Sequence, residues 1–248
     1  MGNSVLLEVC AGSLEDLEAA KAGGADRVEV NSGLQLGGLT PSPALLEEAV
    51  RLFPRGAVAM VRPRPGGFCY TAADWRLLLR DAELALAAGA EGIAVGVLTA
   101  DREIDVPRID ELVRLADSRP VVFHRAFDLT RDWQRSLEIL NELGVQRVLT
   151  SGQAKTAGEG AETLRAMVES SRGMLIRVLA GSGIRADNVK SLLRRTGVQE
   201  VHGTFSRPAD DPGYEVGPFR FAANDQLRVV DADEVRAARR ELEEDSGD

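Results

Sequence analysis

Cysteine is scarce in this chain of 248 residues, which contains only Cys10 and Cys69. Two thiols cannot build the disulfide framework of a small secreted protein, and their scarcity fits a reducing compartment. The N-terminal stretch MGNSVLLEVC has no basic segment followed by a long apolar one, so we do not expect a secretory signal. These absences predict a cytoplasmic protein.

Excess positive charge and long apolar runs are also missing. The 39 acidic and 30 basic residues give a net charge of -9, whereas binding to nucleic acid needs clustered cations that neutralise phosphates. We find no apolar stretch long enough to span a bilayer. We therefore expect neither nucleic acid nor a membrane as a partner. With 44% hydrophobic and 28% charged residues, the chain has the composition of a globular protein with a large core.

An internal repeat is present. Four segments share the same order: a glycine, a small residue, a polar pair and then an apolar run that predicts a strand. Each glycine follows a helical pattern and can end that helix in the left-handed conformation. The copies begin 65, 55 and 53 residues apart, a spacing that suits two strand–helix units rather than one. The segments are GGADRVEV (23–30), AGAEGIAV (88–95), LGVQRVLT (143–150) and TGVQEVHG (196–203).

Four further strands are predicted between these copies, and helical patterns fill the gaps. Eight strands alternating with eight helices indicate a parallel sheet, and the fourfold repetition favours a closed (βα)8 barrel, the TIM barrel. An open doubly wound sheet would predict a G-x-G-x-x-G motif after the first strand, where the chain reads VCAGSLED. The additional strands are 5–10, 57–64, 120–125 and 174–181, and the helical patterns cover 13–23, 43–52, 71–89, 105–116, 131–143, 158–171, 186–195 and 231–244.

The chain is expected to form a single α/β domain. We assign residues 1–207 to the barrel and residues 208–248 to a C-terminal extension that packs on it. The extension begins with PADDPG and ends in the helical pattern DADEVRAARRELEE. We expect the final residues, EEDSGD, to fray.

Charged residues interrupt strands that otherwise have a core composition. Glu8, Glu29, Arg62 and Arg64 are the clearest cases, and isolated buried charges need partners. Because chemistry in such barrels lies at the carboxyl ends of the strands, we expect the two carboxylates to face the two guanidiniums there. Two interpretations remain open: a structural ion-pair network, and a polar pocket for a small anionic or metal-bound ligand.

Both histidines, His124 and His202, fall at predicted strand ends. In the stretch FHRAFD, we predict that His124 points into the barrel mouth, while Arg125 points outward and pairs with a carboxylate such as Asp128. In an enzyme, His124 or Glu29 would transfer protons, and arginines would hold a carboxylate or a developing oxyanion. The candidate catalytic residues are therefore Glu8, Glu29, Arg62, Arg64 and His124.

Two glycine-rich turns follow the last two predicted strands. Gly181 and Gly183 lie in LAGSGIRADNV, and Gly203 lies in HGTFSR. The loops after strands seven and eight form the usual phosphate site of phosphate-binding barrels, where backbone N–H groups and a helix dipole attract anions. We expect an anion or phosphate site at these three glycines, with an ordinary helix-start turn as the alternative.

Several of these motifs together resemble the CutC family of copper homeostasis proteins, from about Leu7 to Ser206. The resemblance implies a cytoplasmic (βα)8 barrel, a homo-oligomer and a role in copper handling, with a poorly defined biochemical activity. The motifs are LEVCAGSLEDLEAAKAGGADRVEV, GGLTPSP, RPRPGGFCY, GVLTADREIDVPR, FHRAFD and RVLTSGQ.

The resemblance also implies a metal ligand. Members proposed to bind Cu(I) have a cysteine at the end of the first strand, which Cys10 matches, and a second one in E-L-C-S at the end of the next strand. Here Asn31 replaces that second thiol. Because Cu(I) prefers sulfur ligands, this predicts weak copper binding at the family position, with Cys69 and Met60 as possible helpers.

Three hypotheses follow. The first is a copper-binding protein. The second is an isomerase- or lyase-type enzyme acting on a small phosphorylated or carboxylated metabolite at the carboxyl face of the barrel. The third is a scaffold for partner proteins.

Overall fold

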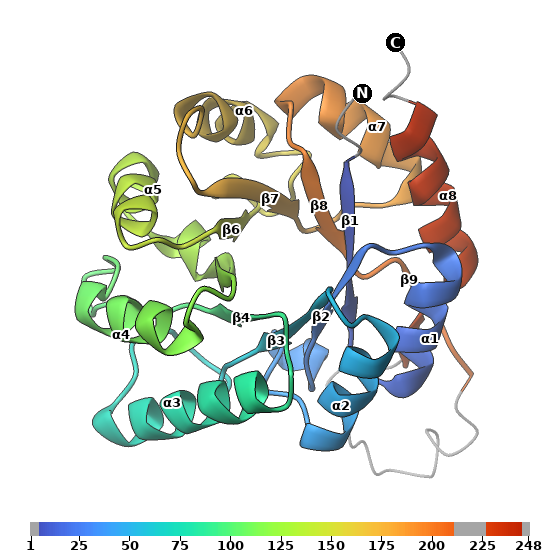
Figure 1. The fold of residues 1–248 in the computed structure, drawn as a ribbon. Coiled ribbons are helices and arrows are strands. Elements are labelled where there is room, and N and C mark those ends of the chain that lie inside the picture. The colour runs from blue at the N-terminus through green and yellow to red at the C-terminus, as the bar shows by residue number, and fades with distance from the viewer. Residues whose placement is uncertain (1–4, 211–226, 245–248) are drawn as a thin grey trace, which may run out of the picture.

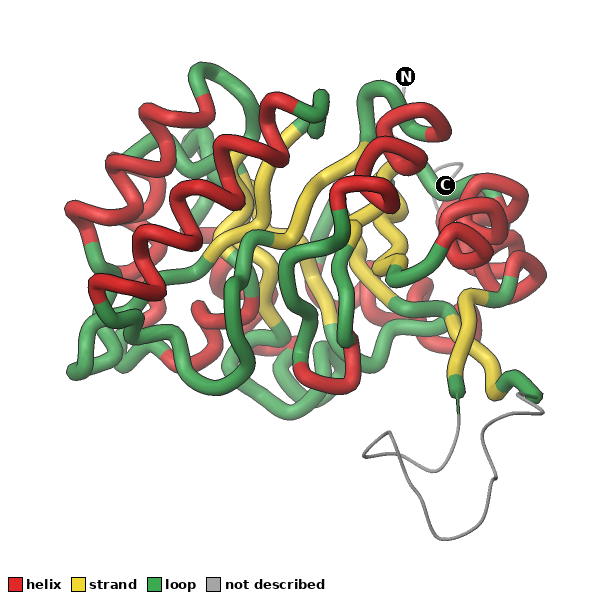
Figure 2. The backbone as a smooth tube through the Cα atoms, turned by 90° about the horizontal axis from the view of Figure 1, so that it is seen from below, coloured by secondary structure: helices red, strands yellow, loops and turns green. Residues whose placement is uncertain are grey.

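The computed structural model describes residues 5–210 and 227–244. Its eight parallel strands form a closed barrel in sequence order, and β1 pairs with β8 to close it. Helices surround the strands (Figures 1 and 2). The predicted TIM barrel is therefore confirmed. The strands are β1 (Leu6–Ala11), β2 (Arg27–Val30), β3 (Ala57–Met60), β4 (Gly92–Val95), β5 (Val121–Phe123), β6 (Arg147–Thr150), β7 (Arg177–Gly181) and β8 (Glu200–Gly203).

Several helices begin at capping residues that the sequence offers. The side chain of Ser13 accepts a hydrogen bond from the backbone of Asp16, and Thr71 forms a capping box with Asp74. At its other end, the first helix is terminated by Gly24, whose φ of 87° a residue with a Cβ rarely adopts. The helices are α1 (Leu14–Gly23), α2 (Pro43–Leu52), α3 (Ala72–Ala87), α4 (Val106–Ala116), α5 (Trp133–Glu142), α6 (Ala161–Ser170), α7 (Ala186–Thr196), α8 (Ala232–Glu244) and the 3₁₀ turns η1 (Leu34–Leu36) and η2 (Arg125–Leu129).

The C-terminal segment supplies the eighth helix of the barrel. Helix α8 packs between α7 and α1, after the antiparallel pair β9 (Ser206–Pro208) and β10 (Arg228–Val230). A Cβ on Gly23 would lie 2.5 Å from the Cβ of Val235, so α1 and α8 can approach this closely only with glycine there. In the described part of the expected extension, α8 therefore packs on the barrel. The terminal residues expected to fray lie largely outside the described residues, since 245–248 are not described.

Alternation along the strands sorts the side chains between two environments. Leu7 and Val9 of β1 belong to the core between strands and helices, so Glu8 and Cys10 face the barrel interior. That interior has an apolar side and a polar side. The apolar side consists of Val58, Met60, Ala94, Val122, Leu149 and Leu179. The polar side comes from β1, β2 and β8 and consists of Glu8, Cys10, Arg27, Glu29, Glu200 and His202, with the partly exposed Arg147 of β6 paired to Glu200.

No helix among the described residues is both long and apolar enough to cross a membrane.

Candidate active site

A cavity of about 370 Å³ lies at the carboxyl ends of the strands. Cys10 of β1, Glu29 of β2 and His202 of β8 contribute to its polar wall, and His124 after β5 lies in the wall as well. Met60 belongs to its apolar part. A cavity of this size that combines apolar side chains with convergent titratable groups is typical of a small-molecule site.

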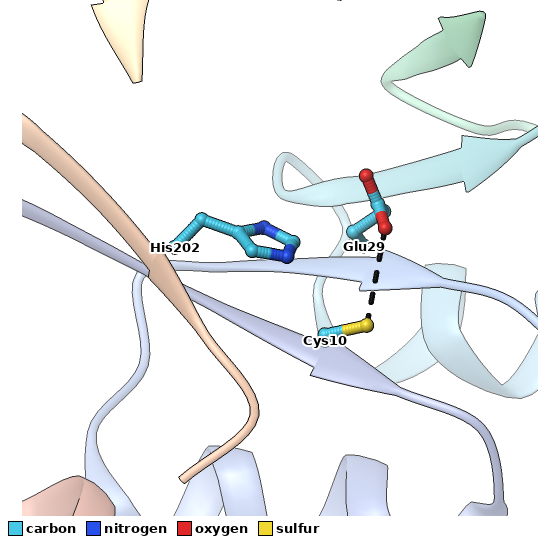
Figure 3. Close-up of side chains that lie close together, drawn as sticks. All are labelled: Cys10, Glu29 and His202. Atoms are coloured by element: carbon cyan, nitrogen blue, oxygen red, sulfur yellow. Dashed lines mark hydrogen bonds between the residues drawn. The ribbon is translucent and has the colours of Figure 1, made fainter. Parts of the chain in front are cut away.

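Cys10, Glu29 and His202 converge on one point of this wall. One ligand atom from each lies within 4.8 Å of the other two, and all three residues are buried. Figure 3 shows the imidazole of His202 extending toward the thiol and the carboxyl group from the neighbouring strand. The thiol of Cys10 donates to Oε1 of Glu29 across 3.9 Å. Asn31 donates from Nδ2 to the sulfur of Cys10 at 2.9 Å.

Glu8 connects His202 of this cluster to Arg27. Its Oε1 lies 2.7 Å from Nδ1 of His202, and its Oε2 accepts from Nε of Arg27. Arg27 in turn donates to Glu200 at 2.8 Å, and Arg147 donates to the same carboxylate oxygen of Glu200 at 2.8 Å. Carboxylates and cations therefore alternate through the polar side of the interior. This pairing compensates the cost of burying each charge.

The same contacts set the protonation states. Burial alone would raise the pKa of Glu8, but the charges of Arg27 and His202 and their hydrogen bonds lower it to about 2. Burial alone would lower the pKa of His202, but Glu29, Cys10 and Glu8 raise it well above its usual value. The imidazole of His202 is thus a cation at neutral pH, oriented by a permanent carboxylate.

The pKa values of Glu29 and Cys10 are both raised above their usual values. Burial, with the nearby charge of Glu8, raises the pKa of Glu29 to about 7 against the opposing effects of His202 and Arg27. Burial also raises the pKa of Cys10, so its sulfur is a thiol at neutral pH. A carboxyl group that titrates near neutrality can both take and release a proton, and such groups are typical of catalytic sites.

The structure places the two predicted arginines away from the carboxylates. Arg62 donates to the backbone oxygens of Leu36 and Gly38, both at 3.0 Å, and of Gly66 at 2.7 Å. Arg64 pairs with Asp74 at 2.9 Å. The expected pairing of these arginines with Glu8 and Glu29 is wrong, because β3 ends at Met60 and the inward alternation does not continue to residue 62. Arg62 instead ties the loops after β2 and β3 together.

His124 and Arg125 follow the prediction for FHRAFD in part. His124 lies in the cavity wall as expected, and Arg125 pairs with Asp128 at 2.9 Å as expected. Arg125 also borders the cavity, so it does not point wholly outward. Asp128 accepts from the hydroxyl of Thr150 at 2.5 Å and from the backbone N–H of Ser151 at 3.1 Å. FHRAFD and VLTSGQ therefore join the ends of β5 and β6.

The glycine turns contribute unequally to the cavity. Gly183 and Gly203 line it, whereas Gly181 lies in β7 and is not part of the lining. Glu234 of α8 also lines the cavity, and its Oε1 accepts from the backbone N–H of Ala186, the first residue of α7, at 3.1 Å. The carboxylate of Glu234 thus caps the N-terminus of α7, close to the turns where we expected a phosphate or another anion. The phosphate site stays a prediction.

The three candidate metal ligands do not all lie at the cavity. Cys10 and Met60 line the cavity, but Cys69 is exposed in the loop after β3 and is not part of the lining. Cys69 is therefore not a helper of Cys10 in this arrangement. The amide of Asn31, at the position of the second family cysteine, donates from Nδ2 to the sulfur of Cys10, whereas a thiol there would offer a second sulfur ligand.

Sequence reasoning missed the groups that hold the site together. His202 was noted only as a residue at a strand end, and Arg27, Arg147 and Glu200 were not singled out. One signal was available: Arg27 and Glu29, like Glu200 and His202, are polar residues two positions apart in equivalent copies of the repeat. Spacing of two places each pair on one face of a strand.

The fold and this site define a TIM-barrel protein with a buried polar cavity at the carboxyl ends of its strands. The model of the CutC family matches residues 5–207. The chain is 44% identical to a family protein CutC of Sinorhizobium medicae over 96% of each chain, and 38% identical to one of Treponema denticola over 94% of this chain and 96% of that one. It belongs to the CutC family.

Solved structures agree with this assignment. The putative copper homeostasis protein CutC from Streptococcus agalactiae superposes with a TM-score of 0.76 at 31% identity, covering 81% of this chain and 98% of that one. A thiamine phosphate pyrophosphorylase from Pyrococcus furiosus superposes with a TM-score of 0.60 at 17% identity, covering 99% and 98%. The second similarity shows the barrel fold alone.

Proposed function

We propose that this protein is an enzyme that binds a small anionic metabolite in the cavity and transfers a proton to or from it. The observation that carries the proposal is the convergence of Cys10, Glu29 and His202 on one point of a cavity of about 370 Å³. Structural ion pairs alone do not need an adjoining cavity. Buried titratable groups at the carboxyl ends of barrel strands are typical of active sites.

The roles follow from the contacts. Glu29, with a pKa of about 7, is the proton-transfer group. His202, held at Nδ1 by Glu8, presents its other ring nitrogen as a fixed positive donor for an anionic oxygen. Cys10 lies beside both as a thiol. This set suits proton abstraction next to a carbonyl or carboxylate, as in isomerase and lyase reactions.

The charge balance supports an anionic ligand. Within the part of the chain that the structure describes, the positive charges of Arg27, Arg147 and His202 pair with two carboxylates, Glu8 and Glu200, when Glu29 carries its proton. The polar side of the interior then has one surplus positive charge, which a carboxylate or phosphate group of a ligand would neutralise.

A thermal shift screen tests the binding. Reduced protein would be heated with phosphate, sulfate, malonate, pyruvate and ribose 5-phosphate, with Arg51→Ala, in an exposed pair on α2, as the matched control. We expect at least one anion to raise the melting temperature of wild type and control alike, but not that of His202→Gln. Proton transfer is then read as deuterium uptake at carbon in the bound anion. Absence of stabilisation by every anion would contradict the proposal.

Copper binding is the second candidate function, and the donor set favours it. The thiolate of Cys10 and the second imidazole nitrogen of His202 suit Cu(I), and the carboxylate of Glu29 is the third donor of the set. Glu8 on the other imidazole nitrogen is the kind of partner that orients metal-bound histidines. Binding must displace protons from Cys10 and His202, which weakens it at neutral pH.

Competition with a Cu(I) chelator separates the two candidates. If copper is the cargo, Cys10→Ser and His202→Gln both weaken Cu(I) binding strongly, and Cys69→Ser does not. If the affinity of the protein for Cu(I) is unchanged by Cys10→Ser, the copper function at this cavity is wrong. The enzyme proposal is untouched by that result.

A further inference from the structure

The imidazole of His124 has one nitrogen in use and one without a partner. Its Nδ1 accepts a hydrogen bond from the backbone N–H of Ala126 at 3.1 Å. A neutral imidazole that accepts at Nδ1 carries its proton on Nε2. That Nε2 is buried, and it has no hydrogen-bond partner within the described residues.

Packing holds the ring in this orientation. A Cβ on Gly96 would lie 2.2 Å from Cε1 and 2.4 Å from Nδ1 of His124, so this edge of the ring fits only against glycine. The ring of Phe68, from the loop after β3, lies 4.9 Å from that of His124 at an angle of 55°. Since the Nδ1 edge is fixed against Gly96 and the residue lines the cavity, Nε2 is the ring nitrogen left for a ligand.

His124 also stands across the barrel from the titratable cluster. In the closed order of eight strands, β5 is four strands away from β1, which carries Glu8 and Cys10. A ligand that fills the cavity therefore lies between His124 and the wall formed by Cys10, Glu29 and His202.

We propose that the Nε2–H of His124 donates a hydrogen bond to a carbonyl or carboxylate oxygen of the ligand, on the side opposite Glu29. This inference rests on the proposed function and narrows its substrate class to carbonyl acids and related oxygen acceptors. His124 polarises the oxygen, and Glu29 exchanges the proton on the adjacent carbon. A buried donor without a protein acceptor is uncommon and is accounted for by such a ligand.

The electrostatics of the site are consistent with a neutral donor. Burial first, and then the nearby charge of Arg62, lower the pKa of His124 to about 3. The ring consequently stays uncharged at neutral pH and needs no counterion. A neutral imidazole can act as the electrophile beside a carboxyl base.

Histidine NMR tests the inference directly, because the chain contains only two histidines. Protein labelled with ¹⁵N in its imidazoles would be titrated with pyruvate, malonate and inorganic phosphate. We expect His124 as the Nε2–H form from pH 5 to 8 and His202 as the cation. A binding probe should shift the Nε2 signals of both rings.

Each other outcome has a definite meaning. If a probe shifts the signals of His202 and leaves those of His124 unchanged, the inference is wrong while the proposed function stands. If no probe affects either histidine, the proposed function fails and the inference fails with it. If His124 is the Nδ1–H form, the donor does not exist and the inference is wrong.

A matched pair of variants separates ligand binding from structure. His124→Asn keeps an acceptor near the Nδ1 position for Ala126 but cannot reach the Nε2 position, whereas His124→Gln places an N–H donor there. We expect His124→Asn to weaken binding of the responding probe about tenfold, the effect of a lost hydrogen bond, and His124→Gln to weaken it less than about threefold. Equal affinity of wild type and His124→Asn would overturn the inference, provided both melt alike.

Discussion

Glu8 and His202 lie opposite each other on the two strands that close the barrel, β1 and β8, and Oε1 of Glu8 is 2.7 Å from Nδ1 of His202. The contact exists only because the chain returns after 194 residues to pair its last barrel strand with its first. Assembly of the site therefore requires closure of the barrel. Glu8 fixes the charge and the orientation of His202, and His202 lines the cavity together with Glu29 and Cys10.

Replacing Glu8 by glutamine should destabilise the fold. Arg27 and His202 would lose their shared counter-charge while remaining buried, and breaking a buried pair in this way costs about 3–5 kcal/mol. The free energy of unfolding would be measured with urea at pH 7. The control is Glu48→Gln, whose exposed pair with Arg51 should be worth less than about 1 kcal/mol. Equal losses in the two variants would contradict the ion-pair account.

Stability of the wild type should fall at acid pH through Glu8. The pKa of Glu8 is about 2 in the folded protein and 4.5 without the fold, so the folded state binds fewer protons between these values. The contribution is complete above pH 4.5 and is lost as the pH falls toward 2, with a total of about 3 kcal/mol. The difference between wild type and Glu8→Gln in urea melts should shrink over this range. If the difference in free energy of unfolding between the two proteins does not change with pH, the lowered pKa of Glu8 is wrong.

Replacing Glu29 by glutamine should have the opposite effect on stability. Its pKa is raised from 4.5 to about 7, so the folded state holds a proton that the unfolded chain has released. The resulting penalty is absent below pH 4.5 and complete above pH 7, where it amounts to about 3 kcal/mol. Glu29→Gln should match wild type at pH 4.5 and exceed it at pH 8 in the same melts. A variant less stable than wild type at pH 8 would show that the carboxylate has a structural role.

The two thiols should differ in reactivity. Burial raises the pKa of Cys10, and the thiolate is the reactive form, whereas Cys69 is exposed. Mass spectrometry after brief iodoacetamide treatment at pH 7.5 should find Cys69 modified and Cys10 intact. Cys69→Ser should then remain unmodified over the same time. Rapid modification of Cys10 in the folded variant would mean that the thiol is neither buried nor protonated as described.

Replacing Glu234 by glutamine should strengthen binding of anions. The carboxylate of Glu234 caps α7 at the cavity edge and repels a second negative charge there. Removing this like charge from the edge of a partly solvated cavity should raise the affinity for phosphate or malonate about 3- to 10-fold. Calorimetric titration would measure it, with Glu243→Gln on the exposed face of the same helix as the control. Unchanged affinity in Glu234→Gln would place the anion elsewhere.

The barrel could be predicted from the sequence because its signals are local. The repeat around Gly24 and its three counterparts marks where helices end and strands begin, and alternation along β1 places Glu8 and Cys10 inside. The charges of Glu8 and Glu29 at inward positions likewise predicted a polar site. Each of these inferences needs only neighbouring residues.

The partners of those charges could not be predicted in the same way. Arg27 and Glu200 are 173 residues apart, and their pairing depends on the register of β2, β1 and β8 in the closed barrel. Arg62 was assigned to the site because β3 was expected to run further than Met60. Because β3 ends four residues before the expected bound at residue 64, Arg62 and Arg64 lie beyond the alternation of side chains along the strand.

A crystal structure of the wild-type protein grown with malonate would test the central claim most directly. The account predicts an ordered malonate inside the cavity, with one carboxylate within hydrogen-bond distance of Nε2 of His202 and an oxygen facing Nε2 of His124. Malonate bound only outside the cavity, or density for a side chain filling the space between these two histidines, would contradict it.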